Sequence, residues 1–139
     1  MKILVTGDRK WSDPEAVERH LKQFGATSVI EGEAPGADTH ARIAAQKNGW
    51  ELFSFPADWN LHGRAAGPIR NRRMLAEKPD LVLAFHDDLS KSVGTRDCVV
   101  CARQMGYPVY LVSHNEADDS ETPATHAQPF HQVALKPGK

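Results

Sequence analysis

Short apolar runs alternate with longer amphipathic segments along the first 112 residues of the chain. A short apolar run bounded by turn residues is typical of a buried parallel strand, whereas apolar residues that recur every three or four positions are typical of a helix. The apolar runs are Lys2–Thr6, Thr27–Glu31, Trp50–Phe55, Asp80–Phe85 and Pro108–Val112. The pattern therefore predicts five strands with helices between them.

Turn and capping residues mark where the predicted helices begin and end. Residues Ser12–Glu15 match a capping box, with Ser12 as the N-cap and a proline in the first turn, where its missing amide costs nothing. Glycine or proline follows each helix and stops it. The other predicted helices are Ala37–Lys47, whose small residues would let it lie close on a sheet, Gly67–Glu77 and Thr95–Met105.

Strands that alternate with helices at this spacing form βαβ units with right-handed crossovers. We therefore predict an α/β, Rossmann-like three-layer fold with a mainly parallel five-stranded sheet. Asp80–Phe85 is the most continuously apolar strand, so we place it near the centre. Residues 1–112 form the predicted domain. The polar segment 113–139 is predicted to be a mobile tail, or to add an edge strand through Phe130–Leu135.

Charge and composition narrow the classes of partner. Seventeen basic and eighteen acidic residues leave a net charge of -1, which argues against a broad basic surface that coats DNA. No apolar run approaches the ~18 residues of a membrane helix, and the chain starts with a strand rather than a leader, so we expect no membrane partner. Two cysteines give no disulfide framework, which favours a cytoplasmic protein.

Metal and redox chemistry find little support in the sequence. The seven histidines show no HxH or HExxH spacing, so we predict neither a metal site nor a cofactor. Cys98 and Cys101 lie in a predicted helix without a second ligand pair, and we expect them to pack in the core.

Glycine, arginine and small polar residues gather directly after the predicted strands. In an open parallel sheet, ligands bind outside the carboxyl ends of the strands. A glycine before a helix lets amide groups approach an anion at the positive helix end, and arginine adds forked, charge-assisted hydrogen bonds. The predicted ligand-binding residues are Gly7, Arg9, Gly32, Gly36, Asp38, Arg64, Gly67, Arg70, Asn71, Gly94 and Thr95.

Within this set, the three arginines would hold phosphate, and Asp38 or Asn71 would fix a sugar or orient the loops. Trp11 or Trp59 could stack on a base, although each is as well suited to the core or to a lid. Arg72 and Arg73 project about 100° and 200° around the helix from Arg70, so we expect them to be solvated surface charges.

Four stretches of the chain together resemble a known family. They are residues 5–9 (VTGDR), 31–41 (EGEAPGADTHA), 57–74 (ADWNLHGRAAGPIRNRRM) and 92–95 (SVGT). They resemble the YspA (cpYpsA-related) branch of the SLOG superfamily over residues 2–112, and the third stretch is the most specific. The resemblance implies a Rossmann-like fold, a homodimer and a nucleotide-related ligand. Proteins of this kind are proposed to sense nucleotide-derived signals, often in conflict or phage settings.

Two groups of relatives suggest different activities. Cytokinin-activating phosphoribohydrolases cleave nucleoside monophosphates, and their arginine four residues before a methionine is matched by Arg70 and Met74. Their PGGxGTxxE loop is degenerate here (residues 91–98, KSVGTRDC), with Cys98 in the glutamate's position and Asp97 one residue earlier. The resemblance therefore offers Arg70 and Asp97 as the catalytic residues, if there is a reaction. The DNA-processing protein A family shares the glycine and aspartate spacing of residues 32–41 and binds single-stranded DNA.

The leading interpretation is a protein that binds or senses a nucleotide or nucleotide-derived phosphorylated metabolite at the carboxyl ends of its strands. The alternatives are a nucleoside-monophosphate N-glycosidase, or another hydrolase acting on a phosphoester bond, and a single-stranded nucleic-acid binding protein. The near-neutral charge makes the last of these less favoured than a small-molecule ligand.

Overall fold

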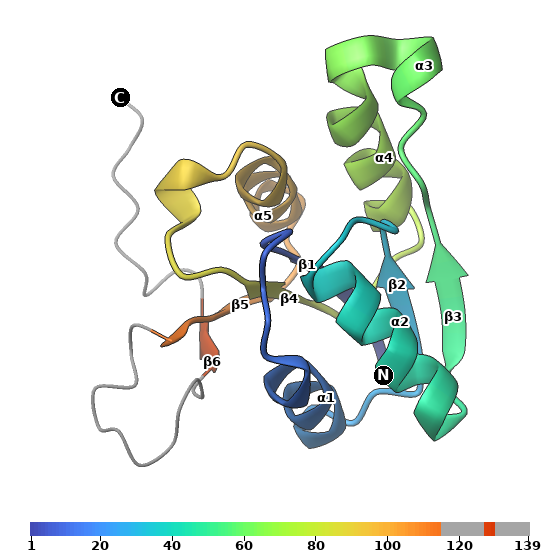
Figure 1. Cartoon of the computed structure of the whole chain (residues 1–139), viewed down its shortest axis with the longest axis vertical. Helices are drawn as coiled ribbons and strands as arrows, with labels where there is room; N and C mark the ends of the chain where they lie inside the picture. Colours follow the sequence, from blue (N-terminus) through green and yellow to red (C-terminus); the bar gives the residue numbers. More distant parts are fainter. Residues whose placement is uncertain (115–126, 130–139) are drawn as a thin grey trace.

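Six strands form one sheet in the order β3-β2-β1-β4-β5-β6 (Figure 1). The computed structural model describes residues 1–114 and 127–129. The five parallel strands are β1 (Lys2–Gly7), β2 (Ser28–Glu31), β3 (Glu51–Ser54), β4 (Leu81–Phe85) and β5 (Val109–Val112). These confirm the predicted parallel sheet.

A sixth strand, at residues where the sequence indicated none, extends one edge of the sheet. β6 (Ala127–Pro129) pairs antiparallel with β5, and Leu111 is opposite Gln128. The segment suggested as an edge strand, Phe130–Leu135, lies outside the described residues. The added strand is therefore contributed by a different part of the polar C-terminal segment.

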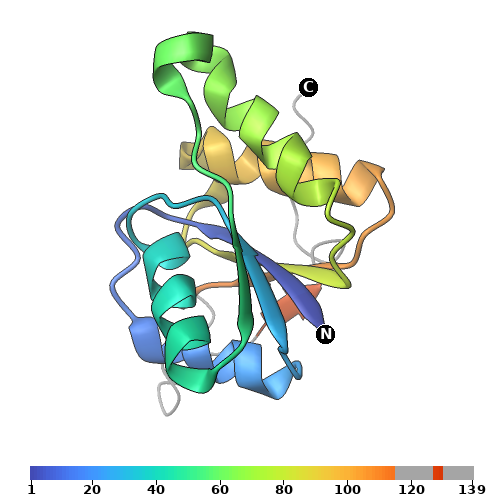
Figure 2. The ribbon, with the colours of Figure 1, turned by 90° about the vertical axis from the view of Figure 1, so that its right-hand side faces the viewer.

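Helices cover both faces of the sheet (Figure 2). On one face α1 (Pro14–Gln23) and α2 (Ala37–Asn48) pack on the side chains of alternate strand residues such as Val5, Leu83 and Phe85. On the other face α4 (Ala66–Leu75) and α5 (Gly94–Gln104) pack on the intervening residues, such as Leu4, Val82 and Ala84. Because successive strand side chains point to opposite faces, each strand contributes to both cores.

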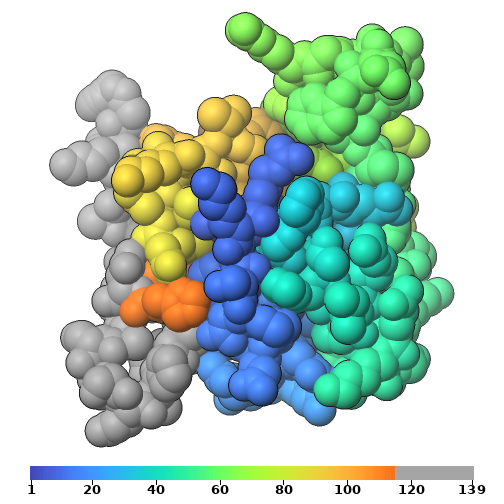
Figure 3. Space-filling view, viewed as in Figure 1, coloured from blue at the N-terminus to red at the C-terminus, as the bar shows by residue number. Residues whose placement is uncertain are grey.

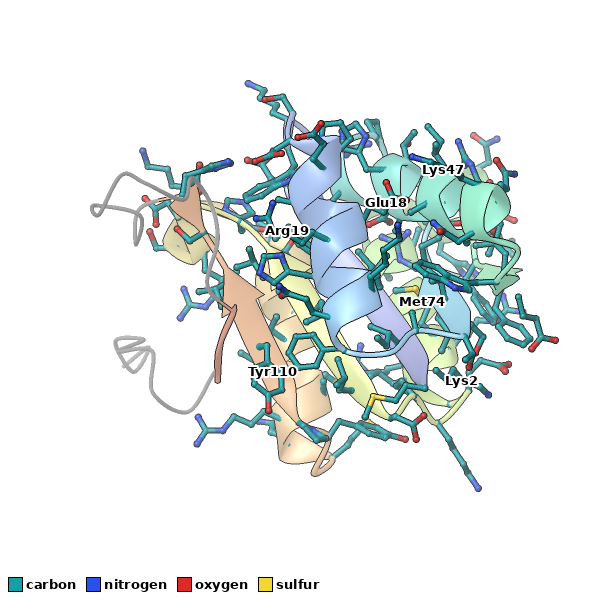
Figure 4. All side chains as sticks on the ribbon, turned by 90° about the horizontal axis from the view of Figure 1, so that it is seen from below. Lys2, Glu18, Arg19, Lys47, Met74 and Tyr110 are labelled. Carbon is teal, nitrogen blue, oxygen red and sulfur yellow. The ribbon has the colours of Figure 1, made fainter. Side chains whose placement is uncertain are left out.

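Local sequence explains how these helices are fixed. Ala37, Ala41, Ala44 and Ala45 are all buried, which confirms the small-residue face predicted for α2. On the outside, Glu18 of α1 accepts hydrogen bonds from Lys47 (3.3 Å) and Asn48 (2.9 Å) of α2 and joins the two helices (Figure 4).

The N-cap of α1 is Asp13, whose Oδ1 accepts the Ala16 amide at 3.1 Å, so the prediction of Ser12 was wrong by one residue. Pro14 occupies the first helical position, where its fixed φ suits the helix. The cap therefore lies directly before the proline.

All five residues of β4 are buried and the strand lies between β1 and β5, which confirms its predicted central place. The chain runs outward from β1 to β2 and β3, then returns to the other side of β1 for β4 and β5. This reversal leaves a crevice outside the carboxyl ends of β1 and β4, the position at which open α/β sheets bind ligands.

A helical overhang follows β3 and projects beyond the strand ends, at the top of Figure 1. It consists of the short α3 (Trp59–His62) and the 3₁₀ turn η1 (Gly63–Ala65), which leads directly into α4. In the described part of the chain no helix is long and apolar enough to cross a membrane.

Candidate functional site

A cavity of about 610 Å³ lies at the carboxyl ends of the parallel strands. Its walls come from the loops after β1, β2 and β4, from the overhang and from the first turns of α4 and α5. Figure 3 shows these segments, coloured dark blue, cyan, yellow and green, side by side on one face. The volume falls within the roughly 300–1,000 Å³ typical of small-molecule sites.

Ten of the twelve candidate site residues line this cavity. They are Gly7, Arg9, Gly32, Asp38, Arg64, Gly67, Arg70, Asn71, Gly94 and Thr95. Residues as far apart in sequence as Gly7 and Thr95 therefore meet at one place. Gly36 and Asp97 are not among the lining residues.

The lining is richer in positive charge than the chain as a whole. Of the described residues that line the cavity, five are basic: Arg9, Lys10, Arg64, Arg70 and Lys91. Three are acidic: Asp8, Glu33 and Asp38. Because the whole chain carries a net charge of -1, this local excess favours an anionic ligand.

Arg70 is held in place by two hydrogen bonds. Its Nη1 donates to the Gly32 carbonyl at 2.7 Å and its Nε donates to Asn71 Oδ1 at 3.0 Å. A Cβ on residue 32 would lie 2.4 Å from Nη1, so only glycine there leaves room for the guanidinium. The two contacts use two of the five N–H donors and fix the plane of the group.

Asn71 connects this arginine to the start of α5. Its side chain is buried, and its Nδ2 donates to the Gly94 carbonyl (3.2 Å) and to Asp97 Oδ2 (3.0 Å). Oδ2 of Asp97 also lies 3.9 Å from Nη1 of Arg72. Asp97 is thereby held by two residues of α4 and does not line the cavity, and its catalytic role stays a prediction.

Two buried carboxylates shape the loop after β2. Oδ2 of Asp38 accepts the amides of Gly32 (3.0 Å) and Ala34 (3.3 Å), and burial raises the pKa of this carboxyl to about 7. Glu31 is fully buried and accepts the Glu33 amide at 2.6 Å and the Ser54 hydroxyl; burial raises its pKa as well. Glu33 is held at φ +60°, an uncommon conformation for a residue with a side chain.

Gly36 does not line the cavity but fixes a crossing of two loops, and its predicted role in anion binding stays a prediction. It is the N-cap of α2 with φ +77°, and a Cβ there would lie 2.2 Å from the Asp8 carbonyl oxygen. The Ala37 amide donates to the same oxygen at 3.2 Å. The absence of a side chain therefore lets the loop after β1, which carries Arg9, cross the start of α2.

Comparison with known proteins gives the chain a family. The family model described as "YspA, cpYpsA-related SLOG family" matches residues 1–62. The Gene 61 protein of Mycobacterium phage D29 is 38% identical over 119 residues, covering 78% of this chain and 93% of that protein. The chain belongs to the YspA, cpYpsA-related SLOG family.

A solved structure shows the same fold. DNA processing protein A (DprA) from Streptococcus pneumoniae matches with a TM-score of 0.63 and 20% identity, over 79% of this chain and 49% of that one. The SLOG chain thus spans about half the length of that protein. The likeness concerns the α/β architecture.

Cys98, which stands where the phosphoribohydrolases have glutamate, is fully buried in the core between the sheet and the helices α4 and α5. Burial raises the pKa of this thiol to about 12, so it is neutral at physiological pH. Cys101 is partly buried against the same core, which agrees with a packing role for both cysteines. Among residues 1–114 and 127–129, no group of three or more His, Cys, Asp or Glu side chains is arranged to hold a metal ion.

The two candidate tryptophans have different places in the structure. Trp11 is buried, packs edge-on against Phe85 and stacks on His114, with the two ring centroids 4.4 Å apart. It is therefore a core residue, and it does not line the cavity. Trp59 is 51% exposed and lines the cavity from the overhang. Only Trp59 remains available to a ligand.

Sequence reasoning missed several lining residues, among them His86 and Lys91. His86 belongs to no motif. The available signal was its position: it is the first polar residue after the most apolar strand, and therefore at the central carboxyl end of the sheet.

Proposed function

We propose that this SLOG protein binds a nucleotide or a nucleotide-derived phosphorylated metabolite in the cavity at the carboxyl ends of its strands. The observation that carries the proposal is the fixed Arg70 guanidinium, which is linked through Asn71 to the first residue of α5. An arginine held beside a helix N-terminus combines forked donors with the positive end of the helix dipole. This is the arrangement that a phosphate group requires.

The phosphate would lie between Arg70 and the start of α5. A Cβ on Gly94 would meet nothing within 4 Å, so the backbone at the beginning of this helix borders open space. Arg9 and Arg64 line the same cavity from exposed positions and would add charge from its rim. Backbone amides at a helix start bind anions without a special sequence.

The rest of the ligand would meet two other kinds of side chain. The exposed face of Trp59 offers a stacking surface for a base. Glu33 and Asp8 are carboxylates that could accept hydrogen bonds from sugar hydroxyls. A phosphorylated nucleoside supplies all three features in one molecule.

We propose binding without cleavage of the N-glycosidic bond. Such cleavage passes through an oxocarbenium-like state, which a carboxylate near the anomeric carbon stabilises. Asp97 is paired with Asn71 and Arg72, and Cys98 is a buried thiol. Incubation with AMP, GMP, CMP, UMP and nicotinamide mononucleotide, followed by chromatography, should show little or no free base. Multiple turnovers abolished by Asp97→Asn would instead establish a hydrolase.

Calorimetric titration with the four ribonucleoside 5′-monophosphates and their nucleosides tests the binding proposal. We expect at least one monophosphate to bind, and its nucleoside to bind at least tenfold more weakly, because the charge-assisted contacts are lost. A single-stranded oligonucleotide belongs in the same series. Binding that is indifferent to removal of the phosphate, or much tighter for the oligonucleotide, would contradict the proposal.

A homodimer stays a prediction that rests on the family. One chain has a mass of 15.4 kDa, and light scattering at high protein concentration should give twice this mass. A monomer mass under those conditions would remove it.

A further inference from the structure

His86 is a buried polar residue in the wall of the cavity. It follows β4 directly, and its backbone amide donates to the Val112 carbonyl at 3.1 Å. The residue is only 8% exposed, yet it is one of the residues that line the cavity. His86 therefore borders the cavity while being almost closed off from bulk solvent.

A backbone contact fixes the tautomer of this ring. The Asp88 amide donates to Nδ1 at 3.0 Å, so Nδ1 must present its lone pair and cannot carry a proton while this bond stands. The ring proton then lies on Nε2, which is a hydrogen-bond donor. Among residues 1–114 and 127–129, Nε2 has no hydrogen-bond partner. Buried donors are almost always paired, which indicates an acceptor supplied by a ligand.

The neighbouring wall identifies the kind of acceptor. Thr95, in the first turn of α5, is 5% exposed and lines the cavity. Its backbone amide donates to Ser92 Oγ at 3.0 Å. Its own hydroxyl makes no hydrogen bond within the described part of the chain. Lys91 also lines the cavity, and its exposed ammonium group lies 3.9 Å from Asp88 Oδ2. Two buried donors beside a helix N-terminus and a lysine suit an oxygen of an anion.

We propose that His86 donates its Nε2–H to an oxygen of the ligand's phosphate group, held between the start of α5 and Arg70. The inference rests on the proposed function and assigns a specificity residue to it. The Nε2–H group would form a hydrogen bond with a phosphate oxygen. When a nucleoside without phosphate binds, this buried N–H would have no acceptor. His86 thereby helps the site to distinguish a phosphorylated nucleoside from the nucleoside itself.

Calorimetry on variants of the full chain tests this assignment. The probes are the ribonucleoside 5′-monophosphate that the wild type binds most tightly and the matching nucleoside. His86→Phe should weaken monophosphate binding about tenfold, the loss of one hydrogen bond to a charged group, and leave nucleoside binding within about twofold. His86→Gln keeps an N–H donor and should recover part of the loss. His40→Phe is the matched control, because His40 contacts the Trp11 carbonyl and does not line the cavity.

A nitrogen-15 NMR spectrum of the wild type gives a readout that does not depend on a variant folding. Long-range correlations should show the His86 proton on Nε2, and adding the monophosphate should shift this resonance. A proton on Nδ1, or unchanged monophosphate binding by His86→Phe, would overturn this assignment while leaving the proposed function intact. Failure of the wild type to bind any monophosphate would overturn both.

Discussion

The two sides of the cavity are built in opposite ways. On the β2 side, Asp38 and Glu31 are buried carboxylates that hold the loop 32–34, and this loop in turn holds Arg70. On the overhang side, every residue from 59 to 65 is exposed, and α3 is fixed locally by its cap, in which Asp58 Oδ1 accepts the Leu61 amide at 3.0 Å.

The difference teaches which contacts should dominate binding. Arg70 is already in place before a ligand arrives, so binding orders little that was free. Arg64 is an exposed side chain on the overhang, and immobilising such a side chain costs about 0.5–1.5 kcal/mol. We therefore expect the β2 side to supply most of the affinity, and the overhang to tune it.

The largest loss of stability should come from Gly36→Ala. The new Cβ would meet the Asp8 carbonyl oxygen at 2.2 Å in a left-handed conformation, and strain plus overpacking should cost on the order of 3 kcal/mol of unfolding free energy. Urea unfolding measures this. An unchanged midpoint would show that the crossing of the two loops is not as tight as described.

Gly94→Ala is the matched control, because the space around its Cβ is open. Its unfolding free energy should stay within about 0.5 kcal/mol of the wild type. Ligand affinity should nevertheless fall, since the methyl group would stand where the phosphate approaches the helix. A stable Gly94→Ala protein with full affinity would place the phosphate elsewhere.

Asp38→Asn should change how stability depends on pH. Burial raises the pKa of Asp38 from 3.8 in the unfolded chain to about 7 in the folded protein. The folded protein therefore holds the proton more tightly, and this contribution to the unfolding free energy is complete below pH 3.8 and is lost as the pH rises through 7. Asparagine can still accept the Gly32 and Ala34 amides without burying a charge. Relative to the wild type, the variant should therefore gain roughly 2–4 kcal/mol between about pH 4 and pH 8. Denaturant unfolding at several pH values measures the difference, and a constant difference would contradict the account.

Arg70→Ala should weaken monophosphate binding by about 1.5–3 kcal/mol, or roughly ten- to a hundredfold. Arg72→Ala is the control, since Arg72 is exposed and is not among the residues that line the cavity. Calorimetry with the same monophosphate compares them. Equal losses from the two variants would defeat the assignment of Arg70.

Arg64→Ala should have the smallest effect, below about 1 kcal/mol, because part of its contact energy is spent on ordering the side chain. Its loss should also shrink at high salt, as expected for an exposed charge. A loss as large as that of Arg70→Ala would show that the overhang is as well fixed as the β2 side, and the comparison would fail.

The alternation of apolar runs was enough to predict the five parallel strands and their helices, because burial on both faces leaves a strong pattern in β4 and its neighbours. The pattern could not predict β6, whose segment is polar. The helix cap was misplaced between Ser12 and Asp13 because both are good capping residues, and the choice between them depends on three-dimensional geometry.

The candidate site was predictable where it depends on strand ends and less so where it depends on side-chain direction. Asp97 accepts a hydrogen bond from Asn71, a partner 26 residues away that sequence spacing cannot reveal, and does not line the cavity. Gly36 has the spacing of an anion-binding glycine, and the close approach of the Asp8 backbone, which also requires a glycine there, could not be read from the sequence. His86 carries no motif, and its role follows from the contact of its ring with the Asp88 amide.

A nitrogen-15 NMR titration of the whole chain with a bound ribonucleoside 5′-monophosphate tests the central claim most directly. The amides of Gly32, Gly94 and Thr95 at the cavity should shift most, and those of Thr27 and Glu51 at the opposite ends of the strands should stay in place. The matching nucleoside should move the Gly94 and Thr95 amides much less. The largest shifts at Thr27 and Glu51, or equal shifts with and without the phosphate, would contradict a phosphate site at the carboxyl ends of the strands.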